Sequence, residues 1–159
     1  MTMNLDLYRP APVVNVEAQP VDRTMPPRDA AGLLCDGTTL LVTDHYRTGV
    51  AILAQLSVLL PAPSSRASYA ERQDHRRSLR AASLRLLAPI KEHALALEEA
   101  GHIGFLAELY PEQSSFLLPF VSVQELYGAW NHYEVGTALP VLGRRVHPFY
   151  GTYAPMRTS

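Results

Sequence analysis

Cysteine and lysine are nearly absent from this chain of 159 residues, which contains only Cys35 and Lys91 of these two types. A single cysteine excludes an intramolecular disulfide and a zinc site built from several cysteines. The same scarcity is typical of proteins in a reducing compartment, so we expect a cytoplasmic location.

Long apolar runs are also absent. No stretch approaches the roughly 20 apolar residues that a helix needs to cross a bilayer. The first ten residues, MTMNLDLYRP, lack the cationic start and the following apolar run of an export signal. We therefore expect neither a membrane span nor export.

Charge of one sign does not predominate. Fourteen Lys and Arg residues are balanced by fifteen Asp and Glu residues, which gives a formal net charge of -1. This balance produces no global field that would attract nucleic acid or an anionic membrane, so either partner would need a local patch. With 47% hydrophobic residues, a chain of this length is expected to form one domain around one core.

The short motifs of catalysis and cofactor binding are missing. The chain contains no GxGxxG loop, no phosphate-binding GxxxxGKS or GxxxxGKT loop, no HExxH and no GxSxG. Cys35, Ser114 and Ser115 lack the sequence context of a nucleophile. The six histidines have no partners at metal-ligand spacing, so we expect no metal site; they are His45, His75, His93, His102, His132 and His147.

The pattern of apolar residues, prolines and glycines predicts a mostly helical chain. Five prolines in residues 1–27 predict an extended or irregular arm. A short helix is expected over residues 28–34, with Pro27 in its first turn and Gly37 as its stop. The β-branched run TTLLVT, residues 38–43, favours a strand.

Three longer helices are expected over residues 44–60, 68–90 and 122–133. Their apolar residues recur every three or four positions, as on one face of a helix. Ser122 and Glu125 have the spacing of a capping box for the third helix. The stripes comprise Tyr46, Val50, Leu53, Leu56 and Leu60, then Leu79, Ala82, Leu86 and Ile90, and finally Val123, Leu126, Trp130 and Tyr133.

These elements predict a mainly α fold, a small helical bundle with one short β-hairpin or strand at its C-terminal end. A winged helix-turn-helix is a second arrangement that the same order of elements allows. The predicted organisation is an arm at 1–27, a helical domain at 28–145 and a strand or hairpin at 146–159 that leads into a missing catalytic domain. Trp130 and Tyr133 are expected to be core residues, because aromatic stripes mostly bury area.

Arginines gather in the second long helix. Arg72, Arg76 and Arg80 are spaced by four, so a helix places them on one face as a strip that suits a phosphate-bearing polyanion. The alternative is a solvated face partly paired with Glu71 and Asp74. No interleaved aromatic residues favour base stacking, which argues against nucleic acid as the partner.

Aromatic residues and one cation gather near the end of the chain. Prolines and a glycine between them form a stiff scaffold that suits one wall of a small-molecule pocket. The alternative is a linker that leaves the domain. The candidate cofactor- or substrate-binding residues are His147, Phe149, Tyr150, Tyr153, Pro155 and Arg157.

The order of these segments resembles the N-terminal accessory region of a group of bacterial class I S-adenosylmethionine-dependent methyltransferases. In those proteins a helical region ends in a stretch like HPxYGxxxPxR, directly before the Rossmann-like catalytic domain. The position is also similar to the strand that precedes the catalytic domain of protein-glutamine methyltransferases. The resemblance spans residues 30–159, and its compact motif comprises His147, Pro148, Tyr150, Gly151, Pro155 and Arg157.

The resemblance implies a substrate-binding or lid domain that is not catalytically complete alone, because the acidic-Gly-x-Gly cofactor loop of the family is absent. It implies S-adenosylmethionine as the cofactor, a catalytic methyltransferase domain in cis or in trans as the partner, and a small molecule or peptide as the substrate. We also expect a homo-oligomer through residues 146–155 if the neighbouring domain is absent. The alternatives are a stand-alone helical module that binds a protein or nucleic acid, and an independent enzyme.

Overall fold

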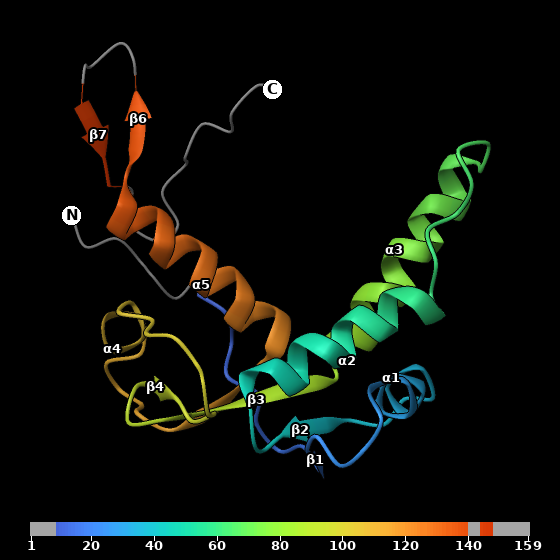
Figure 1. Cartoon of the computed structure of the whole chain (residues 1–159), viewed down its shortest axis with the longest axis horizontal. Helices are drawn as coiled ribbons and strands as arrows, with labels where there is room; N and C mark the ends of the chain where they lie inside the picture. Colours follow the sequence, from blue (N-terminus) through green and yellow to red (C-terminus); the bar gives the residue numbers. More distant parts are fainter. Residues whose placement is uncertain (1–8, 140–143, 148–159) are drawn as a thin grey trace.

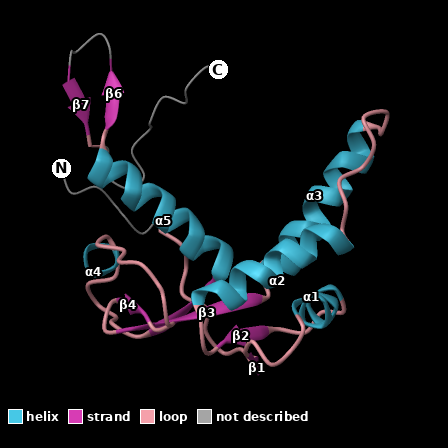
Figure 2. Cartoon of the chain, in the orientation of Figure 1, coloured by secondary structure: helices cyan, strands magenta, loops and turns pink. Residues whose placement is uncertain are grey.

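A computed structural model describes residues 9–139 and 144–147 of the chain. Its architecture is α/β, because a mixed five-stranded sheet lies under the helices (Figures 1 and 2). The prediction of a mainly α bundle with one hairpin, and with it the winged-helix variant, is therefore wrong. The sheet consists of β1 (Gln19–Val21), β2 (Leu40–Val42), β3 (Leu86–Lys91), β4 (Ala94–Leu95) and β5 (Phe116–Pro119).

The sheet is centred on β3. β1, β2 and β3 are parallel, with Gln19 opposite Leu40 and Leu40 opposite Leu86. β5 runs antiparallel to β3, and Ile90 of β3 pairs with β5 on one edge and with β4 on the other. β4 therefore extends the edge of β3 that β2 occupies first. Leu86, Leu87 and Ala88 are all buried, as expected of a strand covered on both faces.

The first helix and strand follow the local signals in the sequence. α1 (Pro27–Cys35) begins with Pro27, whose missing N–H is not needed in a first turn. Gly37 adopts a φ of +96°, which a residue with a side chain rarely does, and the chain then enters β2. β1 lies within the predicted arm of residues 1–27, and its Val21 is buried in the core. This part of the arm is thus a strand of the sheet.

The second long helix is shorter than predicted. α3 (Tyr69–Ser83) ends before β3, so residues 86–90 are a strand rather than the last turns of a helix. Pro89 explains the difference, because proline lacks the helical N–H donor and clashes with the preceding turn. At its other end α3 has a complete capping box, in which Ser68 and Glu71 each accept from the other's backbone N–H.

Helices α2 (Tyr46–Leu59) and α5 (Phe120–Val135) confirm the other two predicted helices. The prediction of a capping box at Ser122 and Glu125 is wrong, since α5 begins at Phe120, after Pro119, and has no side-chain cap. In Figure 1, α2 and α5 lie above the sheet and diverge from it. No helix within the described residues is long and apolar enough to cross a membrane.

The two helices meet where a glycine faces an aromatic ring. A Cβ atom at Gly49 of α2 would overlap the ring of Phe120, the first residue of α5. Tyr46 stacks on the same ring, with 5.1 Å between the ring centroids. Further along α5, Trp130 and Tyr133 are half-buried and pack against Phe105, in agreement with their predicted place in the core.

Two parts of the chain project from this body. α2 and α3 form a hairpin of helices whose outer part stands away from the sheet (Figure 1), and α3 buries only Ala82. The other projection is the hairpin of β6 (Thr137–Leu139) and β7 (Arg144–Val146), directly after α5. The hairpin predicted at residues 146–159 thus begins earlier in the chain, and residues 148–159 lie outside the described residues. A four-residue helix, α4 (Leu106–Leu109), lies between β4 and β5.

Candidate ligand pocket

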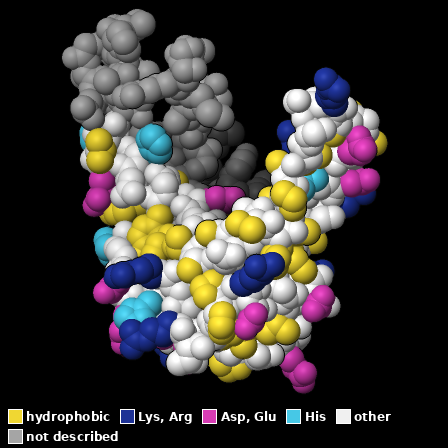
Figure 3. Space-filling model, turned by 45° about the vertical axis from the view of Figure 1, so that its right-hand side comes forward, with side chains coloured by type: hydrophobic (Ala, Val, Ile, Leu, Met, Phe, Trp, Pro, Cys, Tyr) yellow, Lys and Arg dark blue, Asp and Glu magenta, His cyan; other side chains and the backbone are white. Residues whose placement is uncertain are grey.

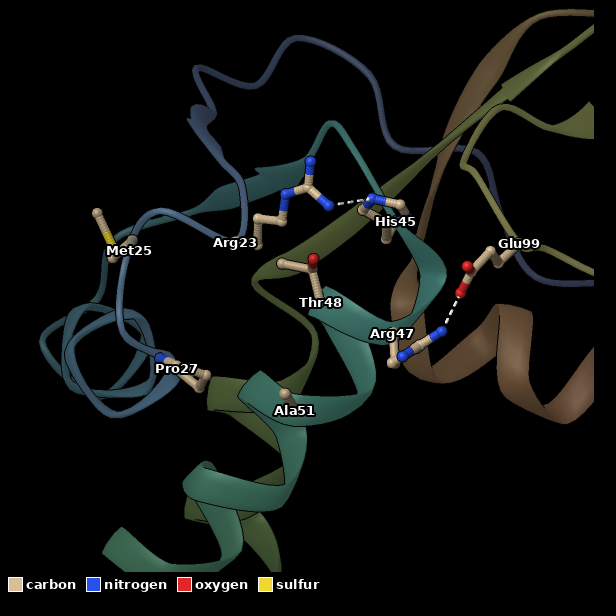
Figure 4. Close-up of a pocket in the computed structure, with 8 residues that line it drawn as sticks. All are labelled: Arg23, Met25, Pro27, His45, Arg47, Thr48, Ala51 and Glu99. Carbon is tan, nitrogen blue, oxygen red and sulfur yellow. Dashed lines mark hydrogen bonds and ion pairs between the residues drawn. The ribbon is translucent and has the colours of Figure 1, made fainter.

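A pocket of about 300 Å³ lies beside the ends of β1 and β2, where the chain turns into α1 and α2 (Figure 4). β1 ends at Val21 and β2 ends at Val42, so the pocket opens at the carboxyl ends of parallel strands. Open sheets in α/β proteins generally bind their ligands at this edge, because the loops that follow the strands converge there. The position therefore makes this pocket the candidate site.

The polar lining comes from three separate segments. Arg23 follows β1, and His45, Arg47 and Thr48 follow β2. Glu99 comes from the segment after β4. That segment is fixed beside the start of α2, because the backbone of the preceding residue, Glu98, bonds to the backbones of Asp44 (2.8 Å) and Tyr46 (3.0 Å).

Asp44 ties the two loops of the pocket together. Its Oδ2 accepts from the backbone N–H of Arg23 at 2.9 Å. Partial burial of the carboxyl raises its pKa, but the backbone N–H groups of Arg23 and His45 and the Thr48 hydroxyl outweigh that effect and leave the pKa below its ordinary value. An ionised Asp44 thus holds the backbone on which Arg23 is mounted.

Arg23 and His45 point toward each other across one end of the pocket (Figure 4). The Arg23 guanidinium lies 2.9 Å from His45 Nε2. A guanidinium has no acceptor atom, so this bond requires an unprotonated Nε2 and therefore a neutral imidazole with its proton on Nδ1. The same Nε2 lies 3.2 Å from a carboxylate oxygen of Glu98.

The other end of the pocket is closed by a different pair. Arg47 donates to Glu99 and forms an ion pair with it (Figure 4). Between the two ends stands Thr48, which at 8% exposure is the buried polar residue of the described part of the chain. Met25, Pro27 and Ala51 supply the apolar wall.

Of the predicted pocket wall, His147 falls within the described residues. Its Nδ1 donates to the backbone oxygen of Tyr133 at 2.5 Å, and the two rings meet edge to face at 6.5 Å. His147 is thereby fixed to the last turns of α5. The other predicted site residues, Phe149, Tyr150, Tyr153, Pro155 and Arg157, lie outside the described residues, as does most of the segment predicted to form an oligomer.

The predicted arginine strip lies on an exposed helix. Arg72, Arg76 and Arg80 are all exposed on α3. Arg72 donates to the backbone oxygen of Ala67 at 2.7 Å, so it is partly engaged. The two acidic residues expected to pair with the strip make other contacts: Glu71 caps the helix, and Asp74 lies 3.6 Å from Arg77. Figure 3 shows basic and acidic side chains intermixed on this projecting arm.

The residues of the pocket were not predicted from the sequence. Arg23 lies in the predicted arm, and Arg47 and Thr48 were seen only as helix residues. Nothing in the local pattern links these residues, because Arg23 is brought to His45 by the pairing of β1 with β2, and Glu99 is brought there by the bridge between His45 and Glu98. Within the described residues, no group of three or more His, Cys, Asp or Glu side chains is placed to hold a metal ion.

Comparisons of the chain with protein-family models, curated proteins and solved structures gave no match.

Proposed function

We propose that the chain is the N-terminal substrate-binding or lid domain of a cytoplasmic S-adenosylmethionine-dependent methyltransferase, completed by a catalytic domain in cis or in trans. The observation that carries this proposal is the motif HPxYGxxxPxR at residues 147–157, which follows a region rich in helices as in the family that the chain resembles. The residues before the motif form an α/β fold and not the helical bundle that we expected, so the proposal depends on the motif alone.

The anchoring of His147 supports a role at a domain boundary. Because His147 is bonded to Tyr133, the motif starts at a fixed point at the end of α5. A segment that starts from a fixed point loses less conformational entropy when it closes over a bound ligand than a segment on a free linker.

The motif residues have the chemistry that a lid over this reaction needs. S-adenosylmethionine supplies a methyl group on a cationic sulfonium, and transfer requires alignment of the acceptor and exclusion of water. The rings of Tyr150 and Tyr153 are suited to pack against a cation or an adenine, and Arg157 is suited to pair with a carboxylate of substrate or cofactor.

The gene that encodes the chain provides the first test. We expect an acidic-Gly-x-Gly motif after a strand, either in frame beyond the codon for Ser159 or in an adjacent reading frame. The polypeptide that carries it, mixed with or joined to residues 1–159, should bind S-adenosylmethionine in a calorimetric titration. A stop codon at Ser159, with no such polypeptide encoded nearby, would contradict the proposal.

The exposed strip on α3 favours one further candidate, a module that binds a polyanionic partner. α3 buries only Ala82, so Arg72, Arg76 and Arg80 are accessible along its length. Retention on heparin should fall with rising salt, and the triple substitution of these arginines by glutamine should reduce both the retention and its salt dependence. Equal retention of the variant and the wild type would show that the strip is a solvated surface and does not bind polyanions.

A further inference from the structure

We infer that the pocket between α1 and α2 binds a small anion, a carboxylate or phosphate group carried on a compact apolar body, with Arg23 as the anchoring cation. The pocket and the segment 147–157 share no residue, so this inference does not rest on the proposed methyltransferase function. It rests on the charges, the fixed geometry and the size of the pocket.

Two arginines line the pocket, and in the described part of the chain they differ in how their charge is paired. Arg47 is neutralised by its ion pair with Glu99. The guanidinium of Arg23 instead contacts His45 Nε2, and within residues 9–139 and 144–147 no carboxylate forms a direct ion pair with it. The Asp22 carboxylate interacts with its charge at longer range, and the Asp44 carboxylate binds its backbone N–H. A neutral imidazole orients a guanidinium without cancelling its charge. Arg23 is thus positioned to form charge-assisted hydrogen bonds with an incoming anion.

Arg23 is also held in place before any ligand arrives. Its backbone N–H is bound by the Asp44 carboxylate and its guanidinium by His45. Fixing a long side chain in advance removes much of the entropy that binding would otherwise cost. A flexible surface arginine, such as Arg77 on α3, has no comparable support beyond its 3.6 Å contact with Asp74.

Two helices, α1 and α2, begin at the pocket. Neither helix has a side-chain cap, but Asp29 lies in the first turn of α1 and the ionised Asp44 accepts from the backbone N–H of His45 at the start of α2. These carboxylates offset the partial positive charge of the helix ends, so the attraction for an anion comes from Arg23. Pro27 has no N–H, so the first residue of α1 donates no hydrogen bond to a ligand. The hydroxyl of the buried Thr48 also lines the pocket, where it bonds to the Asp44 carboxylate.

The remaining wall and the volume define the rest of the ligand. Met25, Pro27 and Ala51 offer an apolar surface beside the polar groups (Figure 4). The volume of about 300 Å³ is at the lower end of the range for small-molecule sites. A small organic acid or phosphate monoester is of suitable size, whereas a dinucleotide is too large.

An NMR titration of the full chain tests the inference with three probes: hexanoate, phenyl phosphate and the uncharged hexanol. We expect saturable shifts of the backbone amides of Arg23, Arg47 and Thr48 with one or both anions, and the better of the two identifies the preferred anionic group. Hexanol should not produce them. The inference is overturned if neither anion gives saturable shifts at these amides, or if hexanol gives the same shifts.

Two substitutions separate specific binding from general attraction of anions. Arg23→Gln should raise the dissociation constant of the preferred anion by about tenfold or more, since it removes the charge-assisted hydrogen bonds. The matched control Arg77→Gln removes the same charge from an exposed site on α3 and should leave the dissociation constant unchanged. Ala51→Leu adds bulk to the apolar wall and should weaken the binding of hexanoate. Each variant should keep the wild-type spectrum away from the pocket, which shows that it is folded. Equal effects of Arg23→Gln and Arg77→Gln would refute the site.

Discussion

Helices α2 and α3 are neighbours of nearly equal length, 14 and 15 residues, but they are stabilised in different ways. α2 buries Ile52 and Leu56 completely and has no side-chain cap at its N-terminus. α3 buries only Ala82 and begins with a complete capping box. Packing therefore holds α2, whereas local hydrogen bonds contribute a larger share to α3.

This difference assigns the two helices to different roles. Because the core fixes α2, its N-terminal turn does not need a cap of its own and lies open at the pocket beside Arg23. The N-terminus of α3 is already satisfied by Ser68 and Glu71, so it has no such opening. The α2 end of the pair is suited to a small ligand, and the α3 end presents an exposed charged surface.

The largest expected effect comes from the contact that holds α2 against α5. Phe120→Ala should lower the free energy of unfolding by about 3–5 kcal/mol, since it empties a fully buried site against Gly49 and Tyr46. Tyr69→Ala on α3, where the residue is 72% exposed, should change it by less than about 0.5 kcal/mol. Urea denaturation measures both. Similar losses in the two variants would contradict the contrast between the helices.

A pair of glycines sharpens the same contrast. Gly49→Ala places a methyl group against the buried Phe120 ring and should destabilise the protein by about 1–3 kcal/mol, despite the better helix propensity of alanine. Gly128→Ala in α5 is the matched control, because a Cβ there has no atom within 4 Å. The free energy of unfolding of this control variant, measured by thermal or urea denaturation, should rise by up to about 1 kcal/mol. If Gly49→Ala instead stabilised the protein, the Phe120 ring would have to move aside for the added methyl group, and the contact would not be tightly packed.

Tyr127, which packs edge to face against Tyr46 of α2, provides a test by pH. Burial, together with the neighbouring Tyr46, raises the pKa of Tyr127 to about 12. A pKa raised in the folded state stabilises the protein fully below about pH 10, the ordinary tyrosine value, and this contribution is lost as the pH rises toward about 12.

Absorbance at 295 nm should therefore show Tyr127 ionising with a pKa of about 12, a transition that Tyr127→Phe removes. The variant should also lose less stability than the wild type between pH 10 and 12, because it lacks the linked proton. An unchanged absorbance titration in the variant would contradict this environment for Tyr127.

The smallest effect is expected at the start of α3. Ser68→Ala removes one half of the capping box and should increase amide hydrogen exchange in the first turn of α3. Exchange in α2 should not change, because the two helix starts are independent. Ala67→Ser, next to the cap, is the control. Faster exchange throughout α2 would show that the arm and the body unfold together.

The sequence predicted those parts of the fold whose causes are local. α1 begins at Pro27 and ends before Gly37, and the stripe of apolar residues in α2 is visible within one helix. The strand β3 was missed because Leu86 and Ile90 continue the spacing of Leu79 and Ala82, so the helical stripe runs without interruption into the strand. Only the pairing of Leu40 with Leu86, 46 positions apart, distinguishes the two, and that pairing is non-local.

The candidate pocket was not predictable for the same reason. Arg23, His45 and Glu99 become neighbours through the pairing of β1 with β2 and the bridge between His45 and Glu98. Each residue alone is ordinary in its own segment. The motif at 147–157, by contrast, is contiguous in the sequence, which is why a resemblance could identify it.

The most direct test of the proposed function is hydrogen exchange, followed by mass spectrometry, on the chain joined to or mixed with its catalytic polypeptide. With S-adenosylmethionine added, we expect slower exchange in residues 147–157 and no change in α3. Unchanged exchange in residues 147–157, under conditions where calorimetry shows the cofactor bound, would contradict the proposal that this segment closes over the methyltransferase site.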